Sequence, residues 1–317
     1  NKSWITEQFD QMVMTDTIQK SGGNAAIIRI HKKEKAIAVT VDSSSNYCKA
    51  HPLTGGKQIV CESWRNLISV GAKPIAITNC LNFGNPENPK VMGEFAECLI
   101  GIKEACEFLD YPVVSGNVSF YNGTNKKNID PTPVIGGVGL IKDSKNKINH
   151  SLKKEENIIL QVGKTFGHLY QSVFFKEIYT ITEGPPPEIN LSNEKSNGEI
   201  VLKLISSKLV ESVHDISSGG LIIALAEMSI SSQYGLNIEK PSQLSDLMGY
   251  YFGEDQGRYL LEIEPNKLQK VTKVLSENNI YHEKIATVQK DNFEIIGEFK
   301  ININDLYKIN NKWYNNY

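Results

Sequence analysis

The chain has 317 residues, which exceeds one average domain and favours two domains that share an interface. Apolar residues make up 40% of it, charged residues 22%, and the net charge is −2. These ordinary values argue against a strongly basic nucleic-acid binder or an acidic tail, and no apolar run of about 18 residues predicts a membrane span.

The first third of the chain predicts alternating strands and helices. Residues 25–30 and 36–42 read as two short strands joined by a charged turn, which is typical of a hairpin. A polar loop is expected over residues 43–56. From Lys57 onward, apolar positions recur at helical spacing until Gly71, where a glycine that ends a helix belongs.

The following segments complete a first domain. A buried strand is predicted over residues 74–81, and an apolar stripe over residues 91–109 predicts a second helix. Strands are expected at residues 112–120 and 134–141. This order of elements implies a mixed sheet in an α/β (α+β) fold, and it places the first domain at residues 1–145.

A polar stretch rich in lysine and asparagine over residues 143–157 has the composition of a linker. Beyond it, a second α/β domain is expected over residues 155–317. Its predicted elements are strands at residues 158–162 and 259–263 and helices at residues 200–209, 221–228 and 268–275.

The cysteines indicate a reducing environment. All five lie in the first third of the chain, and they form no Cys-x-x-Cys pair. We therefore expect reduced, mostly buried thiols and a cytoplasmic protein. The chain opens at Asn1 without a methionine, and residues 3–10 have no targeting character, which favours a piece of a longer polypeptide.

Two strand ends carry small polar side chains. Residues 79–86 leave the predicted strand and break at a glycine and a proline, and short amides at such a place can meet a nucleotide or a metal. Asparagine and glycine are also ordinary turn formers. Further on, Gly116 permits close approach of a ligand to the backbone, and Asn117 and Ser119 project to one face. A β-bulge is the alternative interpretation at Gly116.

Two later segments give weaker signals. Residues 214–220, His-Asp-Ile-Ser-Ser-Gly-Gly, precede an apolar helix, so Ser217 or Ser218 is expected to cap it while the glycines let backbone amides reach an anion. Residues 252–258 mix acids, an amide and an arginine, which suits a polar ligand or a domain interface. His214 is expected to be structural rather than a general base.

These motifs together resemble one family. They are Gly55-Gly56-Lys57 with Arg65-Asn66-Leu67, Leu81-Asn82-Phe83-Gly84-Asn85-Pro86, Gly116-Asn117-Val118-Ser119, His214-Asp215-Ile216-Ser217 with Gly219-Gly220, and Gln256-Gly257-Arg258. From Trp4 to about Ile296 the chain resembles the second half of the synthetase subunit of phosphoribosylformylglycinamidine synthase, in the aminoimidazole ribonucleotide synthetase-like superfamily.

The resemblance implies a carbon–nitrogen ligase of de novo purine biosynthesis that needs ATP and Mg²⁺. In such an enzyme ATP phosphorylates the formyl amide oxygen of formylglycinamide ribonucleotide, and ammonia from glutamine displaces phosphate to leave the amidine. The implied partners are the first half of the same enzyme, a glutaminase subunit and a small accessory subunit, with no nucleic acid polymer and no membrane. The catalytic histidine and most Mg²⁺-binding acids belong to the first half, so no catalytic residue is assigned here and the chain is expected to be inactive alone.

Carried over one residue at a time, the resemblance implies that Gly116 contacts the nucleotide, Asn117 binds Mg²⁺ and Ser119 contacts the substrate. Asn79 falls where the family commonly has an aspartate that contacts ATP, and an amide can still hydrogen-bond to an adenine or ribose edge. Residues 170–172 replace a usual Gly-Gly-Ser turn, and residues 43–46 lack the expected glycines and arginine. These departures imply that the nucleotide site in this half is degenerate.

Two rival interpretations remain open. Another superfamily enzyme, such as a selenophosphate synthetase or a thiamine phosphate kinase, is disfavoured because the chain has no Cys/Sec-type nucleophile near its start and no acid-rich metal loop. A noncatalytic structural lobe, with a trapped nucleotide or none, is favoured over independent catalysis for this chain by itself. A homodimer through the first domain is expected if a seam that the longer chain covers is exposed.

Overall fold

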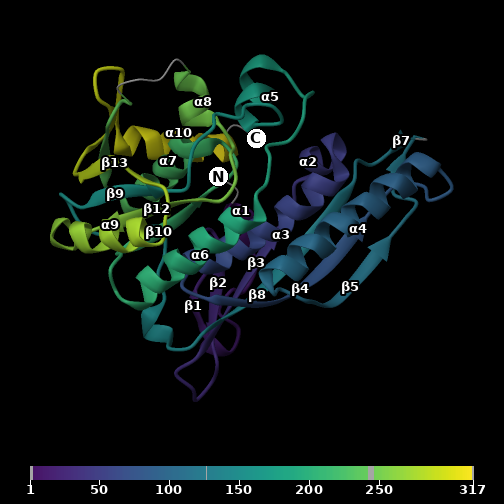
Figure 1. Cartoon of the computed structure of the whole chain (residues 1–317), viewed down its shortest axis with the longest axis horizontal. Coiled ribbons are helices and arrows are strands. Elements are labelled where there is room, and N and C mark those ends of the chain that lie inside the picture. The colour runs from purple at the N-terminus through teal and green to yellow at the C-terminus, as the bar shows by residue number, and fades with distance from the viewer. Residues whose placement is uncertain (1–2, 126, 242–245, 316–317) are drawn as a thin grey trace.

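Two sheets organise the computed structural model, which describes residues 3–125, 127–241 and 246–315. The first sheet has six strands in the order β1-β2-β3-β8-β4-β5, and the second has seven in the order β10-β12-β9-β13-β11-β14-β15. Figure 1 shows the sheets in two neighbouring bodies, with the chain passing once from the first to the second. The predicted α/β class with mixed sheets is confirmed, because each sheet holds one parallel pair, β4–β5 and β11–β14, among antiparallel ones.

The first body contains short elements as well as two long helices. Its strands are β1 (Thr17–Gln19), β2 (Ala26–Arg29), β3 (Ala36–Asp42), β4 (Lys73–Asn82), β5 (Val113–Ser119), β6 (Gly123–Thr124), β7 (Lys127–Asn128) and β8 (Thr132–Ile141). Its helices are α1 (Ser3–Glu7), α2 (Ser45–Ala50), α3 (Pro52–Ser69), α4 (Pro89–Leu109) and the 3-10 turns η1 (Val13–Thr15) and η2 (Ser144–Asn146).

The second body adds shorter helices around its sheet. Its strands are β9 (Ile158–Val162), β10 (Ser212–Ile216), β11 (Gly235–Ile238), β12 (Arg258–Ile263), β13 (His282–Gln289), β14 (Asn292–Ile295) and β15 (Phe299–Asn302). Its helices are α5 (Val173–Tyr179), α6 (Leu191–Ser206), α7 (Gly220–Ser232), α8 (Leu247–Phe252), α9 (Leu268–Glu277), α10 (Ile303–Asn315) and the 3-10 turn η3 (Pro265–Lys267). No helix in the part of the chain that the structure describes is long and apolar enough to cross a membrane.

One face of the first sheet is covered and the other is open. Along β3 and β8, alternate residues are buried, which is the period of a strand with one face on the core. Helices α3 and α4 pack together and cover the buried face, and Figure 1 shows them running across the sheet. On the other face, Val41 keeps 69% of its surface exposed. The sheet therefore offers an apolar surface that this chain leaves uncovered.

The predicted hairpin forms, but the predicted loop over residues 43–56 is wrong. Strands β2 and β3 pair antiparallel, as expected. Residues 43–56 instead hold α2 and the first turn of α3, which begins at Pro52 and is capped by the ring of His51. A Cβ atom at Gly55 would lie 2.5 Å from the backbone of Cys48, so this glycine allows two helices to touch and does not mark a loop.

The helix predicted over residues 200–209 begins nine residues earlier, as α6. Asn190 caps its N-terminus by accepting a hydrogen bond from the amide of Asn193, at 3.0 Å. The first half of α6 is polar and was therefore not predicted as helix. A helix that packs through a glycine needs few apolar side chains around that glycine. Gly198 lies directly against Trp64 of α3, and this contact joins the two bodies.

The predicted serine cap of α7 is also wrong. Gly219, with φ of 84°, occupies the N-cap position, and the cap has no side-chain hydrogen bond of its own. His214 and Asp215 lie inside β10, a fully buried strand that pairs with β12. The expectation that residues 252–258 suit a domain interface is met, since Gln256 contacts Arg65 of the first body at 3.1 Å.

Candidate functional site

The four residues singled out from the sequence lie on two neighbouring parallel strands. In the register of β4 and β5, Asn79 is opposite Gly116 and Asn82 is opposite Ser119. The alternative interpretation, a β-bulge at Gly116, is wrong, because the register shift in β5 comes before Ser115. Residues 116–119 therefore pair regularly, and the strand ends do bring the predicted residues side by side.

These residues point to two different faces of the sheet. Residues opposite each other on paired strands share a face, and successive residues alternate. Asn117 and Ser119 therefore lie on the open face, whereas Asn79 lies on the face of the helices with Gly116. A Cβ atom at Gly116 would lie 1.9 Å from Oδ1 of Asn79, so glycine is required where that amide crosses the strand. The four residues surround one strand end but do not converge on one point.

Asn122 was missed from the sequence, although it positions Ser119. Its side-chain nitrogen donates to the carbonyl of Phe83 at 3.0 Å and to both the carbonyl and the hydroxyl oxygen of Ser119 at 3.0 Å. Phe83 is buried in the core between the strand and α4. The signal that could have indicated Asn122 is its place in a turn directly after a strand, where asparagine commonly bonds the backbone.

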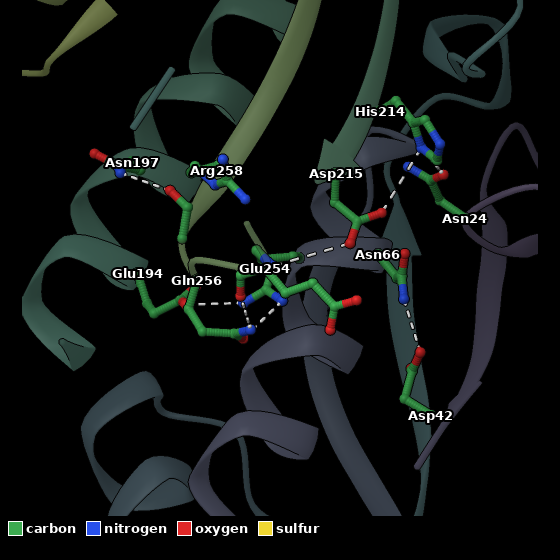
Figure 2. A network of polar contacts seen from close by, with 12 residues as sticks. Asn24, Asp42, Asn66, Glu194, Asn197, His214, Asp215, Glu254, Gln256 and Arg258 are labelled. Carbon is green, nitrogen blue, oxygen red and sulfur yellow. Dashed lines mark hydrogen bonds and ion pairs between the residues drawn. The ribbon is translucent and has the colours of Figure 1, made fainter. Parts of the chain in front are cut away.

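A second polar region lies between the two bodies and opens into a cavity of about 1000 Å³. Residues of the first body, including Asn24, Asp42 and Asn66, face His214 and Asp215 across it (Figure 2). Asn66 donates to Asp42 at 2.7 Å within the first body. Among the described residues, no lysine or arginine lines this cavity, so it suits a ligand that donates hydrogen bonds better than a phosphate.

His214 bridges the two bodies in this region. Its Nδ1 lies 2.6 Å from Oδ1 of Asn24 and its Nε2 lies 3.0 Å from a carboxylate oxygen of Glu227. Burial lowers the pKa of His214, but the hydrogen bond to Glu227 and the charges of Asp215 and Glu227 outweigh burial and raise it. The neighbouring ring of His150 stays neutral, because burial and the charge of His214 lower its pKa to about 4. Both ring nitrogens of His214 therefore have partners, and these contacts link the two bodies.

Arg65 is the centre of a buried charge network. Its side chain is fully buried, and its two terminal nitrogens bond Glu194 at 2.8 Å and Gln256 at 3.1 Å. Its Nε lies 4.0 Å from Asp215. Figure 2 shows Glu194, Gln256, Glu254 and Asp215 close together; they come from α6, from the connection before β12 and from β10. A guanidinium can bridge several acceptors at once, so Arg65 fixes the relative orientation of the two bodies.

The acids around Arg65 outnumber it, and two of them have raised pKa values. Burial, followed by the charge of Asp42, raises the pKa of Glu62 to about 8, although Arg65 opposes the shift. Burial and the charge of Asp215 raise the pKa of Asp42 to about 7, against the hydrogen bonds from Thr40 and Asn66. At neutral pH this network therefore carries fewer negative charges than its composition indicates.

We expect the stability of the chain to depend on pH through Glu62. Its pKa rises on folding from 4.5 to about 8, so the folded chain binds more protons than the unfolded chain between these values. Linkage then makes the free energy of unfolding fall as pH rises through this window. Glu62→Gln removes the titrating proton, and the variant should lose less stability than the wild type between about pH 5 and pH 8 in urea unfolding, by about 1 kcal/mol or more.

Glu107→Gln is the matched control for this measurement. Glu107 lies on the exposed side of α4, and its ion pair with Lys103 is long, at 3.8 Å. The unfolding free energy of the Glu107→Gln variant should run parallel to that of the wild type at every pH. A Glu62→Gln variant that follows the same parallel course would contradict the raised pKa of Glu62.

Two groups of backbone amides in the second body bind carboxylates of the chain itself. Glu254 accepts from the amide of Gly219 at 2.8 Å and from that of Val173 at 2.7 Å, at the starts of α7 and α5. Asp255 accepts from the amides of Phe166, Gly167 and His168 at 2.8 to 3.2 Å. The anion expected before α7 is therefore Glu254, and neither group of amides is free to bind a phosphate.

Comparison with known proteins finds two matching family models. The model described as AIR synthase related protein, N-terminal domain, matches residues 22–141, and the model of the C-terminal domain matches residues 154–297. Subunit PurL of phosphoribosylformylglycinamidine synthase from Pelagibacter ubique is 55% identical over 317 residues, covering 100% of this chain and 43% of that protein. PurL from Bradyrhizobium diazoefficiens is 44% identical over 314 residues, covering 99% of this chain and 42% of that protein.

Solved structures agree on the fold. Thermotoga maritima PurL complexed with FGAR superimposes with a TM-score of 0.76 at 16% identity, covering 91% of this chain and 49% of that one. The same protein complexed with AMPPCP gives a TM-score of 0.64 at 25% identity, covering 92% of this chain and 42% of that one. A HypE–HypF complex chain also matches, with a TM-score of 0.68, 16% identity and coverage of 95% and 97%. The two-body fold is therefore shared by solved proteins with different names.

Proposed function

The chain belongs to the AIR synthase related family, and on this premise we propose that it is the second half of a phosphoribosylformylglycinamidine synthase subunit. That enzyme converts formylglycinamide ribonucleotide to formylglycinamidine ribonucleotide with ATP and with ammonia from glutamine. The observation that carries the proposal is similarity to the curated subunits along the whole chain. The chain spans less than half of their length, so the complete activity requires the rest of the polypeptide.

The open face of the first sheet supports a partner of this kind. Val41, Ile75 and Ile28 are exposed on β3, β4 and β2, and the edge strand β5 is exposed along most of its length as well. Burial of apolar surface is the main driving force for association. We assign this face to the first half of the enzyme, with a homodimer as its substitute when that half is absent. A glutaminase subunit and a small accessory subunit complete the proposed assembly.

The residues of this chain fit part of an ATP and Mg²⁺ site. In the proposal, Gly116 and Asn79 contact the nucleotide, Ser119 contacts the ribonucleotide substrate and Asn117 supplies one oxygen to Mg²⁺. No group of three or more His, Cys, Asp or Glu within the described ranges could hold a metal ion. Since Mg²⁺ prefers oxygen ligands, Asn117 would supply one of them, and water, phosphate oxygens and acids of the first half would supply the others. The bound ion would offset charge on the phosphoryl group during its transfer.

A noncatalytic lobe with a degenerate nucleotide site is the second candidate. The side chain of Asn79 carries no charge. At the starts of α5 and α7, the backbone amides of Val173 and Gly219 already donate to Glu254. Gln171 also adopts a left-handed φ of 62°, a conformation that favours glycine, at the turn where the family has one. These observations favour a binding or buttressing role for this half, with the reactive groups on the other half.

An activity assay separates the two candidates. In the complete subunit, Asn117→Ala should raise the Mg²⁺ concentration for half-maximal turnover by about tenfold, because an inner ligand is lost. Asn278→Ala, at the exposed end of α9, is the matched control and should leave this concentration unchanged. If Asn117→Ala behaves like the control, the noncatalytic lobe is the better assignment.

The chain by itself should give no turnover. Adding the first half should restore formation of the amidine product, measured by consumption of ATP and formylglycinamide ribonucleotide. Turnover by this chain alone would contradict the proposal, since the catalytic histidine is assigned to the first half.

A further inference from the structure

A cavity of about 820 Å³ in the second body borders the Arg65 network through Glu194 and Gln256, and it shares no lining residue with the cavity beside His214. It lies between the loop after β9, the proline-rich segment at residues 185–186, the start of α6 and residues 255–257. Its volume falls within the range of ligand pockets, about 300 to 1,000 Å³. The residues that line it lie about 50 or more positions along the chain from Asn117.

The walls of this cavity are held in place by hydrogen bonds. The ring of His168 bonds the carbonyl of Pro185 at 2.9 Å, and Gln171 donates to the carbonyls of Thr182 and Gly184 at 3.0 and 2.9 Å. A Cβ atom at Gly184 would lie 2.3 Å from the ring of Tyr170, so glycine lets the segment pass against this ring. The cavity is therefore formed before any ligand arrives, which lowers the entropy cost of binding.

Aromatic rings form one wall and remain open to a ligand. Tyr170 is 48% exposed, although it packs edge-on against Phe175, with ring centroids 5.7 Å apart. Phe166, at the mouth, is 75% exposed. Exposed rings in a preformed cavity suit a flat ligand, because stacking of two aromatic groups contributes binding free energy beyond that of the buried area.

The charges around the cavity exclude a phosphate. The charged residues that line it are Glu188, Glu194 and Asp255, with no lysine or arginine among them. The loop amides that would hold a phosphate are already bonded to Asp255. Lys164 lies nearby but contacts the ring of Phe166, 5.4 Å from its centroid. An anionic group would therefore meet repulsion here.

The polar groups of the lining favour a ligand that donates a hydrogen bond. Glu194 is almost fully buried and already paired, because its Oε1 accepts from Arg65 and its carboxylate lies beside the backbone of Gly257. The carboxylate of Glu188 is exposed at the same cavity. An amino group on a flat ring can donate a hydrogen bond to this exposed carboxylate. This combination matches the base of a nucleoside.

We propose that this cavity binds an uncharged amino-bearing heterocycle, either the free base or its nucleoside, by stacking on Tyr170. The inference goes beyond the ligase function proposed above and does not depend on it. The site discriminates against nucleotides because its lining is acidic, whereas the strand-end site is expected to require the phosphates.

Calorimetric titration of the full chain with adenine, adenosine and AMP tests the proposal. Adenine or adenosine should bind at least tenfold more tightly than AMP. Tyr170→Ala should weaken that binding by about tenfold, as loss of one stacked ring does, while Tyr170→Phe should retain it. Tyr281→Ala removes a ring of similar exposure elsewhere on the surface and should change nothing.

Asn117→Ala should leave this binding unchanged, which separates the cavity from the strand-end site. Three results would overturn the proposal: no binding of adenine or adenosine at millimolar concentration, tighter binding of AMP, or adenosine binding that survives Tyr170→Ala. Circular dichroism of the Tyr170→Ala chain, expected to match that of the wild type, ensures that a loss of binding reports the missing ring.

Discussion

Arg65→Met is expected to lower the free energy of unfolding by about 3 to 5 kcal/mol, because it leaves buried acids without their counter-charge. Arg65 is fully buried and bonds Glu194 at 2.8 Å. Its removal leaves the buried carboxylate of Glu194 without a positive partner. It also removes the cation that lowers the pKa of Glu62. Equilibrium unfolding in urea, followed by tryptophan fluorescence, measures the change; Trp64 on α3 lies next to the network.

Arg29→Met is the matched control for this experiment. Arg29 also bonds a carboxylate at short distance, Asp16 at 2.7 Å, but its side chain is 45% exposed. An ion pair in contact with water contributes between about 0 and 1 kcal/mol, so the control should lose little stability. Equal losses for the two variants would show that burial does not set the contribution of Arg65. Arg65→Lys should fall between them, since lysine keeps the charge but cannot bridge two acceptors in one plane.

Gly198→Ala is expected to destabilise the chain by about 1 to 3 kcal/mol, the usual cost of overpacking a core. A Cβ atom at this position would lie 2.0 Å from the ring of Trp64 and 2.8 Å from the hydroxyl of Tyr259. Both rings are large and buried, so relief requires α6 to move away from α3. Because this contact joins the two bodies, the midpoint of thermal unfolding should fall and the transition should broaden.

The same substitution at Gly93 should have the opposite sign. Gly93 lies within α4, and a Cβ atom there would meet nothing within 4 Å. Alanine in an open helical position stabilises by about 0.5 to 1 kcal/mol relative to glycine. If Gly93→Ala and Gly198→Ala shift the unfolding midpoint in the same direction, helix propensity rather than the contact with Trp64 controls Gly198.

Long amphipathic or apolar segments were predicted well from the sequence. The helix predicted over residues 91–109 corresponds to α4, and strands β3, β4, β5 and β8 lie where the apolar runs indicated. Several elements were missed, among them the short α2, α5, β14 and β15 and the longer β13. The pattern of a long segment sums many weak local preferences, whereas a short segment takes its conformation from the surface against which it packs.

The sequence by itself determined the alternation of strands and helices and the resemblance to a family, because both depend on residues read in order. Only the tertiary structure decided which faces the candidate residues occupy, with Asn117 on the open face and Gly116 beneath Asn79. It also decided the partners of Arg65, which lie 129 and 191 residues along the chain. Charge pairing and burial depend on distances in space, and neighbours along the chain do not reveal those distances.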